Sequence, residues 1–200
     1  MIKKLLVATR NSGKVSEFSR MLSGLTFEVV GLNDLGIDLE VEETGSTFEE
    51  NAVIKARAYA NASGELTLAD DSGLVVDALN GEPGVLSARY GGEGLDDDGR
   101  VQLVLDKMEH LPGWERTARF VAVLALVGSD VPNGLVTSEG VVEGAICHER
   151  LGENGFGYDP VFWLVGLTKT TAQLSGEEKD AVSHRGAALR GLTETLEALV

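Results

Sequence analysis

The chain has 200 residues, of which 43% are hydrophobic and 24% are charged, and its formal net charge at pH 7 is −15. This composition is ordinary for a globular protein and allows either one large domain or two small lobes. The acidic excess argues against a nucleic-acid polymer or an anionic membrane surface as partner, because both would repel the protein.

The N-terminal pattern predicts a strand, a polar loop and a helix. Residues 2–8 form an apolar strand-like run, and the loop Thr9-Arg-Asn-Ser-Gly-Lys14 separates it from a helical periodicity. Free backbone N–H groups at such a helix start can bind an anion, and Lys14 would add a cation. The loop is not a P-loop, because Ala8 and Val15 stand where that motif needs a glycine and a hydroxyl residue.

An acidic segment precedes the next predicted helix. Residues 35–45 carry Glu42 and Glu43, and capping boxes within 46–50 predict a helix that runs to about residue 63. The segment is either a solvated acidic loop or, through one of the two glutamates, part of a cation site.

The stretch 66–78 is predicted as two short strands separated by a turn at residues 70–73, because Asp, Ser and Gly favour turns. Adjacent carboxylates at the end of a buried strand, here Asp70 and Asp71, are costly to desolvate unless a cation lies beside them. Mg²⁺ would serve, since it prefers carboxylate oxygen and retains some of its waters. The alternative is an exposed turn without chemistry.

The second half of the chain predicts a helix from Asp96 or Asp97 and two neighbouring strands over 116–127 and 134–142. Glycines around Phe156 would expose its ring on a thin loop, where it could either stack on a planar base or fill the core.

The C-terminal helix is predicted to begin at Ser183, which places His184 and Arg185 in its first turn. Cations at that end of a helix are unfavourable unless a ligand justifies them. Lys14, Lys55, Lys179 and Arg185 are the basic residues that lie in glycine-rich or turn contexts.

The expected location is the cytoplasm. A single cysteine, Cys147, cannot form an internal disulfide, which agrees with a reducing compartment. The first residues lack the pattern of a secretory leader, and the longest apolar run, 120–127, is too short to span a bilayer. No membrane partner is expected.

Motifs spread over nearly the whole chain closely resemble, in the same order, those of the inosine triphosphate pyrophosphatases, also called dITP/XTP pyrophosphatases. The matching stretches are Thr9-Arg-Asn-Ser-Gly-Lys14, Glu42-Glu-Thr-Gly-Ser-Thr-Phe-Glu-Glu-Asn-Ala52, Ala69-Asp-Asp-Ser-Gly-Leu74, Gly81-Glu-Pro-Gly84, Ser87-Ala-Arg-Tyr90, Gly155-Phe-Gly-Tyr-Asp-Pro160 and Ser183-His-Arg-Gly186.

The resemblance implies an α/β fold with two lobes around a long mixed β-sheet flanked by helices, and an active-site cleft between the lobes. It implies that residues 1–200 form one such domain, which acts as a homodimer. The implied activity is Mg²⁺-dependent hydrolysis of ITP, dITP or XTP to the monophosphate and pyrophosphate, which cleanses the nucleotide pool.

The resemblance also implies roles for individual residues. Asp71 would be the proton acceptor and a metal ligand, and Glu42 or Glu43 would share the metal. The substrate-binding residues would be Thr9, Arg10, Asn11, Ser12, Gly13 and Lys14 at the phosphates, Ser72 and Lys179, Phe156, Gly157, Tyr158 and Asp159 as the base platform, and His184 and Arg185 at the base edge. Arg10 departs from the family, where many relatives have glycine, and either adds a cation or points to solvent.

Two alternatives remain at this point. The chain could be a pyrophosphatase for other modified nucleotides, or a nucleotide-binding protein without catalytic activity. The intact pairs Asp70-Asp71 and Glu42-Glu43 argue against the second.

Overall fold

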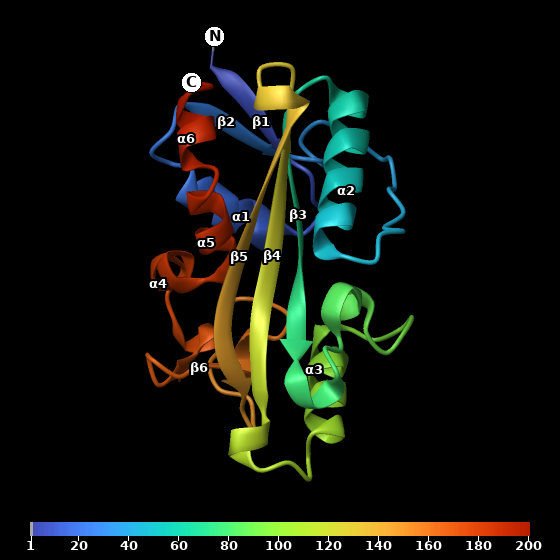
Figure 1. Cartoon of the computed structure of the whole chain (residues 1–200), viewed down its shortest axis with the longest axis vertical. Coiled ribbons are helices and arrows are strands. Elements are labelled where there is room, and N and C mark those ends of the chain that lie inside the picture. The colour runs from blue at the N-terminus through green and yellow to red at the C-terminus, as the bar shows by residue number, and fades with distance from the viewer. Residues whose placement is uncertain (1) are drawn as a thin grey trace. The chain divides into compact units, whose positions relative to one another are not determined.

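The computed structural model describes residues 2–200, and its strands form one seven-stranded sheet with the order β2-β1-β3-β4-β5-β6-β7 (Figure 1). β1 pairs in parallel with β2 and β3, whereas β6 is antiparallel to β5 and β7, so the sheet is mixed. The predicted α/β class with a long mixed sheet flanked by helices is confirmed. The strands are β1 (Lys3–Val7), β2 (Phe27–Gly31), β3 (Leu66–Val76), β4 (Thr117–Val127), β5 (Leu135–Ile146), β6 (Phe162–Leu164) and β7 (Lys169–Thr170). The helices are α1 (Ser12–Met21), α2 (Phe48–Ser63), α3 (Asp97–Lys107), α4 (Gly176–Val182), α5 (His184–Arg190) and α6 (Thr193–Glu197).

The chain divides into two compact units, and the boundaries between them fall within β3, β4 and β5 and after the first residue of α5. The first unit comprises the residues up to Asp71 together with Ala122–Gly140 and Arg185–Val200. The second comprises Ser72–Val121 and Val141–His184.

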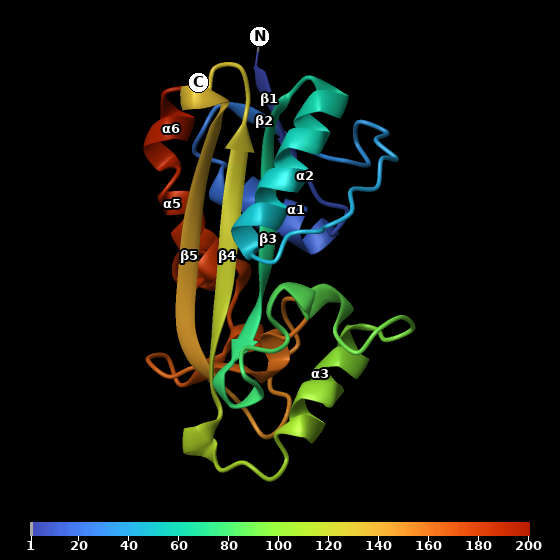
Figure 2. The same ribbon diagram turned by 45° about the vertical axis from the view of Figure 1, so that its right-hand side comes forward.

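In the first unit, helices cover both faces of the sheet. Leu5 and Val7 pack with α1, α5 and α6, whereas Leu6, between them in the chain, packs with α2 on the other face (Figures 1 and 2). This alternation follows from the two-residue period of a strand. The first strand is therefore buried on both sides, as its continuous apolar run predicts.

Local signals fix the two helices that matter most for the site. The Asn11 side chain accepts a hydrogen bond from the Lys14 amide and caps α1. Thr47 and Glu50 form the predicted capping box of α2, and Gly64 ends that helix in the left-handed conformation. α2 thus begins at the cap that the sequence predicts, whereas α1 begins at Ser12, within the stretch predicted as a loop.

The prediction of a turn at residues 70–73 is wrong, because β3 runs without interruption from Leu66 to Val76. Asp70 and Asp71 lie inside this strand and are 3% and 7% exposed, so the reading as an exposed turn is also wrong. The turn propensity of Asp, Ser and Gly is a local preference, which tertiary contacts override.

The C-terminal region also differs from the prediction of a single helix. α5 begins at His184, next to the predicted cap, but it ends at Arg190, and a separate short helix, α6, follows. A further helix, α4, precedes them and is opened by a capping box between Ser175 and Glu178.

The second unit has a hydrophobic core of its own. Apolar residues of α3, including Val101 and Val104, pack against Leu74 of β3, Phe120 of β4 and Phe162 of β6. Figure 2 shows α3 beside the strands of this unit. Residues 152–155 are exposed and Phe156 is half-buried outside this core, so its ring is neither fully exposed nor a core residue.

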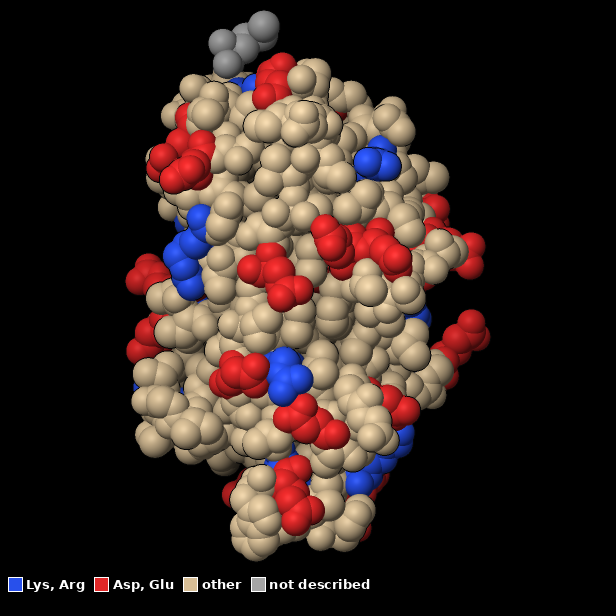
Figure 3. All heavy atoms as spheres, viewed as in Figure 1, with Lys and Arg blue, Asp and Glu red and all other residues tan. Residues whose placement is uncertain are grey.

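Among residues 2–200, none of the helices combines the length and the apolar content that crossing a membrane requires. On the face drawn in Figure 3, acidic side chains are prominent and the basic side chains lie among them. This distribution agrees with the acidic composition and offers no broad basic surface on that face for a nucleic-acid backbone.

Candidate active site

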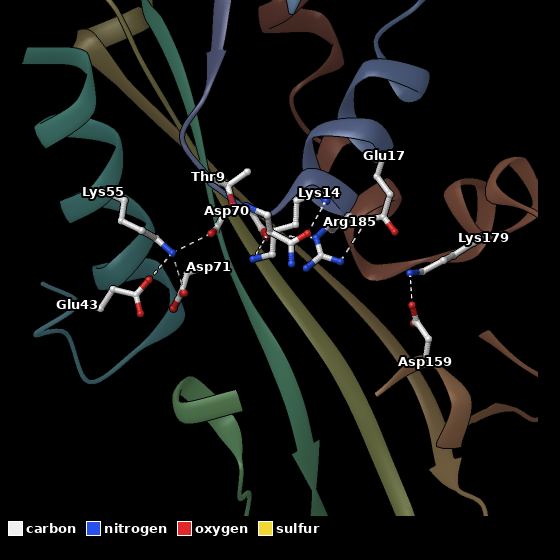
Figure 4. Close-up of polar contacts among 11 residues, drawn as sticks. Thr9, Lys14, Glu17, Glu43, Lys55, Asp70, Asp71, Asp159, Lys179 and Arg185 are labelled. Carbon is white, nitrogen blue, oxygen red and sulfur yellow. Dashed lines mark hydrogen bonds and ion pairs between the residues drawn. The ribbon is translucent and has the colours of Figure 1, made fainter. Parts of the chain in front are cut away.

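Four charged side chains meet at Asp70 in the first unit. The Asp70 Oδ2 atom lies 2.7 Å from Lys14 Nζ and 3.1 Å from Arg185 Nε, and Arg185 Nη1 lies 3.3 Å from Glu17 Oε2 (Figure 4). Lys14 comes from α1 and Arg185 from α5, and Arg185 is 115 positions from Asp70 in the chain. Buried ions in such a network compensate one another, since an unpaired buried charge is strongly destabilising.

The electrostatics of Asp70 favour its ionised form. Burial alone would raise the pKa of this carboxyl group, but Lys14 and Arg185 outweigh it and hold the pKa well below its usual range. Burial also lowers the pKa of the Lys14 ammonium, with contributions from Arg185 and Lys55, although Asp70 opposes the effect. Asp70 is therefore a permanent anion in this unit and is unsuited to accept a proton.

Asp71 lies in a different environment. Lys55 of α2 donates to Asp71 Oδ1 at 3.0 Å, to the Asp70 carbonyl oxygen at 2.9 Å and to Glu43 Oε1 at 2.7 Å. Burial would lower the pKa of the Lys55 ammonium, but the two carboxylates raise it instead. The lysine is thus held as a cation between Glu43 and Asp71 (Figure 4).

The pKa of Asp71 is raised, chiefly by burial and further by the negative charges of Glu43 and Asp70, against the opposing effect of Lys55. Its second oxygen, Oδ2, is buried and has no hydrogen-bond partner. A buried carboxylate oxygen without a partner is costly, which marks it as a place for a cation or a water molecule. Two adjacent carboxylates on one strand therefore have opposite properties.

These residues fit a hard divalent cation. Asp71 Oδ2 and the nearby Glu43 carboxylate are the oxygen ligands that Mg²⁺ prefers, and Lys55 already occupies the position of a cation between them. Within residues 2–200, no group of three or more His, Cys, Asp or Glu side chains could hold a metal ion. Mg²⁺ does not require such a cage, because it is commonly held by one or two carboxylates, waters and the phosphates of the substrate. Glu42 is exposed and has no ion pair with Lys55, so the geometry favours Glu43 over Glu42.

The predicted phosphate loop follows β1 and enters α1. The register of β1 and β3, in which Val7 pairs with Leu68, places this loop beside Asp70. Thr9 Oγ1 accepts a hydrogen bond from the Asn11 amide, and Ser12 and Gly13 form the first turn of α1 together with Lys14. The first turn carries no acidic residue, so the positive end of the helix dipole is uncompensated there.

Arg10 has partners that the sequence did not predict. Its Nη2 atom donates to the carbonyl oxygens of Ile37 at 3.3 Å and Leu39 at 3.1 Å. The guanidinium therefore bonds to the segment that leads to Glu43.

In the second unit, Asp159 is the centre of the predicted base platform. Its Oδ2 atom accepts from the Phe156 amide at 2.9 Å and pairs with Lys179 Nζ at 2.5 Å, and Oδ1 accepts from the Thr171 hydroxyl at 2.9 Å. Lys179 Nζ lies 4.7 Å from the centre of the Phe156 ring. Asp159 is 2% exposed, so its carboxylate orders the loop from within.

The remaining predicted residues of this unit are held in its interior or at its edge. The Tyr158 hydroxyl donates to the Ser87 carbonyl oxygen at 2.9 Å, and the Gly157 amide to Asp97 Oδ2 at 3.2 Å. The His184 ring stacks on Phe120 with 4.7 Å between ring centres and an interplanar angle of 15°. Ser72 is half-buried on β3.

The structure thus brings several of the predicted residues together. In the first unit Lys14 and Arg185 meet at Asp70, whereas Glu43 and Asp71 meet at Lys55, and in the second unit Phe156 and Lys179 meet at Asp159. Sequence reasoning missed Glu17 and Thr171 and gave Lys55 no role. Lys55 was counted among the basic residues in glycine-rich or turn contexts, but it lies within α2, and nothing in the sequence singles out Glu17 or Thr171.

Comparison with known proteins gives consistent results. A model of the Ham1 family matches residues 5–195. A dITP/XTP pyrophosphatase of Bacillus cereus is 47% identical over 195 residues, which cover 98% of this chain and 95% of that protein.

Solved structures agree as well. The Ham1 protein of Staphylococcus aureus has a TM-score of 0.84 and 43% identity, and the match covers 99% of this chain and 100% of that one. The nucleoside-triphosphatase / dITP/XTP pyrophosphatase of Mycobacterium abscessus has a TM-score of 0.73 and 49% identity, with 94% and 98% covered.

Proposed function

This chain belongs to the Ham1 family, and from that membership and the charge arrangement around Asp71 we propose that it hydrolyses deaminated purine nucleoside triphosphates. The substrates would be ITP, dITP and XTP, and the products the monophosphate and pyrophosphate. The names of the relatives support this assignment. The observation that carries it is the buried Asp71 carboxylate, whose Oδ2 atom has no partner and whose pKa is raised.

Attack of water on the α-phosphorus requires a base and a means of neutralising charge on the phosphate oxygens. A raised pKa makes Asp71 a better proton acceptor than an ordinary aspartate. Lys55 fixes the orientation of this carboxylate through Oδ1, so the two lone pairs of Oδ2 would serve both the cation and the proton of the attacking water. Asp70 cannot replace it, because its lone charge is committed to Lys14 and Arg185.

Asp71 and Glu43 would hold the Mg²⁺ ion that the family resemblance implies. When bound, the ion would lower the pKa of a coordinated water and offset charge on the phosphate. The protein's own contribution is to present two carboxylates whose geometry is set by Lys55.

The triphosphate would bind at the start of α1. Backbone N–H groups at a helix N-terminus attract phosphate, and no acidic side chain in the first turn competes. Lys14 lies there with a lowered pKa and already pairs with Asp70, so it presents a fixed cation rather than a mobile one.

The base would stack on Phe156, which Asp159 and Lys179 hold in place. A 6-keto purine offers an acceptor where adenine offers an amino group, and donors such as His184 and Arg185 favour the keto base. An unpaired buried polar group costs on the order of 1–3 kcal/mol, which is enough to select against adenine.

A panel of nucleotides tests the proposal. Pyrophosphate release from ITP, dITP, XTP, dUTP and the four standard ribonucleotides would be measured with and without Mg²⁺. We expect metal-dependent release from the first three at rates at least about tenfold above that from ATP, whose base has an amino group at position 6. Preference for a pyrimidine would support the alternative of a different modified nucleotide, and binding without release would support a silent binding protein.

The homodimer implied by the resemblance and the cytoplasmic location expected from the sequence are further proposals. Sedimentation equilibrium of the purified chain tests the first, and fractionation of the source cells tests the second.

A further inference from the structure

The segment 37–45, which carries Glu43, has no helix or strand of its own. Both of its ends are nevertheless attached to the rest of the first unit, chiefly by side chains of α2. The groups that are bonded at these ends are backbone N–H and C=O groups of the segment, not its carboxylates.

The first attachment is at Leu39. Its carbonyl oxygen accepts from the Tyr59 hydroxyl at 3.1 Å and from Arg10 Nη2 at 3.1 Å. Tyr59 is 4% exposed and belongs to the apolar core beneath α2, so its hydroxyl is held at a fixed place. Arg10 adds a bond from the loop that enters α1.

The second attachment is at Gly45. Its amide donates to Asn51 Oδ1 at 2.8 Å, and Asn51 is fully buried. A Cβ atom on residue 45 would lie 2.6 Å from Asn51 Oδ1, so the close approach requires glycine. The Asn51 Nδ2 atom has no hydrogen-bond partner, and retaining such a costly group is consistent with a function for the Oδ1 contact.

The three contacts follow one stripe of α2. Asn51, Lys55 and Tyr59 are spaced four residues apart, which places them on one face in successive turns. They contact Gly45, Glu43 and Leu39 in turn, so the segment runs antiparallel to the stripe.

We propose that Asn51 and Tyr59 are positioning residues that hold Glu43 in place for the cation before any ligand binds. The inference rests on the proposed function only for the identity of the cation. An unstructured segment would have to be ordered on binding, whereas a segment already held at both ends avoids that entropic penalty. Removing either contact therefore weakens metal binding while the chemical step at saturating metal is retained.

The test compares Tyr59→Phe and Asn51→Leu with the wild type, and uses Tyr90→Phe as the matched control. Tyr90 is also a buried residue, and its hydroxyl donates to Glu82 at 2.6 Å and accepts from Lys107 at 2.6 Å, but it lies in the second unit. Two measurements need no substrate: hydrogen exchange of the amides in 38–45, and binding of Mn²⁺ alone by electron paramagnetic resonance. The third measurement is the rate of pyrophosphate release at saturating metal.

We expect exchange in 38–45 to accelerate and the Mn²⁺ dissociation constant to rise about threefold to tenfold in both variants, with the maximal rate within about twofold. Tyr90→Phe leaves both substrate-free measurements unchanged. If Asn51→Leu does not fold, Gly45→Ala probes the same contact from the other side.

Unchanged exchange and unchanged Mn²⁺ affinity in Tyr59→Phe and Asn51→Leu would overturn the proposal. Because both measurements precede catalysis, that result is distinct from a failure of the proposed function, which would appear as absent pyrophosphate release in the wild type.

Discussion

Lys55 binds one oxygen of the Asp71 carboxylate at 3.0 Å and leaves the other buried without a partner. The preceding residue, Asp70, is instead neutralised by two cations, Lys14 and Arg185. The same residue type at consecutive positions of β3 is thus a reactive group in one case and a structural anion in the other. Their substitution by asparagine should have opposite consequences.

Asp71→Asn is expected to abolish turnover without lowering stability. The variant loses the proton acceptor, which contributes about 10²- to 10⁴-fold in rate. Burial raises the pKa of Asp71, so the native state binds this proton more tightly than the unfolded state. Its contribution to stability is therefore present below the unfolded pKa and is lost as pH rises through the folded pKa. At pH 7 the neutral asparagine should be tolerated as well as the ionised carboxylate.

Pyrophosphate release and the midpoint of thermal unfolding at pH 7 measure the two effects. Near-normal turnover would show that the proton acceptor is another group. A melting temperature well below that of the wild type would instead show that the Lys55–Asp71 pair stabilises the fold.

Asp70→Asn is expected to destabilise the protein strongly. It would leave Lys14 and Arg185 buried beside an uncharged group, and breaking a buried ion pair typically costs about 3–5 kcal/mol. The pKa of Asp70 is lowered despite its burial, because Lys14 and Arg185 stabilise the anion. Its stabilisation is thus present above the unfolded pKa of about 3.8 and is lost as pH falls through the much lower folded value.

Urea unfolding of Asp70→Asn and of the wild type between pH 3 and pH 7, at intervals of about one pH unit, measures this difference. The gap between the two proteins should be widest at neutral pH and should narrow on acidification. A constant gap would mean that the charge of Asp70 is not its source.

The acidic limb of the pH–rate profile should depend on Lys55. Catalysis falls as the proton acceptor is protonated. In the metal-free protein burial raises the pKa of Asp71 and Lys55 opposes that shift, and bound Mg²⁺ would lower the pKa further. Lys55→Gln removes one of these two cations and should move the limb to higher pH. Rates of both proteins at saturating Mg²⁺ and ITP across pH 4–8, roughly the range in which a perturbed carboxylate titrates, give the comparison. If the acidic limb does not move in Lys55→Gln, Lys55 does not affect the pKa of the group whose protonation limits the rate.

The features of the fold and the site that the sequence predicted depend on residues close together in the chain. The cap of α2 depends on residues within one helical turn, Thr47 with Glu50, and it was predicted, whereas the cap of α1 at Asn11 was not. The spread of family motifs correctly indicated the α/β fold and the Ham1 relationship.

The continuity of β3 was not predictable, because its cause is not local. Asp70 to Gly73 favour a turn by themselves, and the strand persists because Lys14 and Arg185, from helices far along the chain, compensate the charge of Asp70. The hydrogen bonds of Arg10 are also long-range in the sequence, since its partners Ile37 and Leu39 are 27 and 29 residues away. Side-chain pairing across such separations leaves no periodic trace in one sequence.

Thr171→Val is expected to raise the KM for ITP by several-fold with little effect on kcat. The variant keeps the shape of the side chain but removes the hydroxyl that donates to Asp159, whose carboxylate also holds the Phe156 amide and Lys179. A loosened Phe156 loop weakens stacking of the base without altering the groups of the first unit. Thr171→Ser retains the hydroxyl and should restore the KM. Equal KM values for the valine and serine variants would assign Thr171 to packing alone.

His184→Ala and Arg185→Ala are expected to reduce the preference for ITP over ATP more than they reduce ATP cleavage. Each substitution removes a hydrogen-bond donor to the 6-keto oxygen of the base, so transition-state binding should weaken by about 1–3 kcal/mol for ITP alone. Arg185→Ala should also unfold more readily, because Asp70 and Glu17 lose their partner, whereas His184→Ala removes only a ring stacked on Phe120. The ratio of kcat/KM for ITP and ATP, measured well below each melting temperature, separates the two effects. A ratio unchanged in His184→Ala, together with equal losses on both nucleotides in Arg185→Ala, would place both residues outside base recognition and confine Arg185 to the ion network around Asp70.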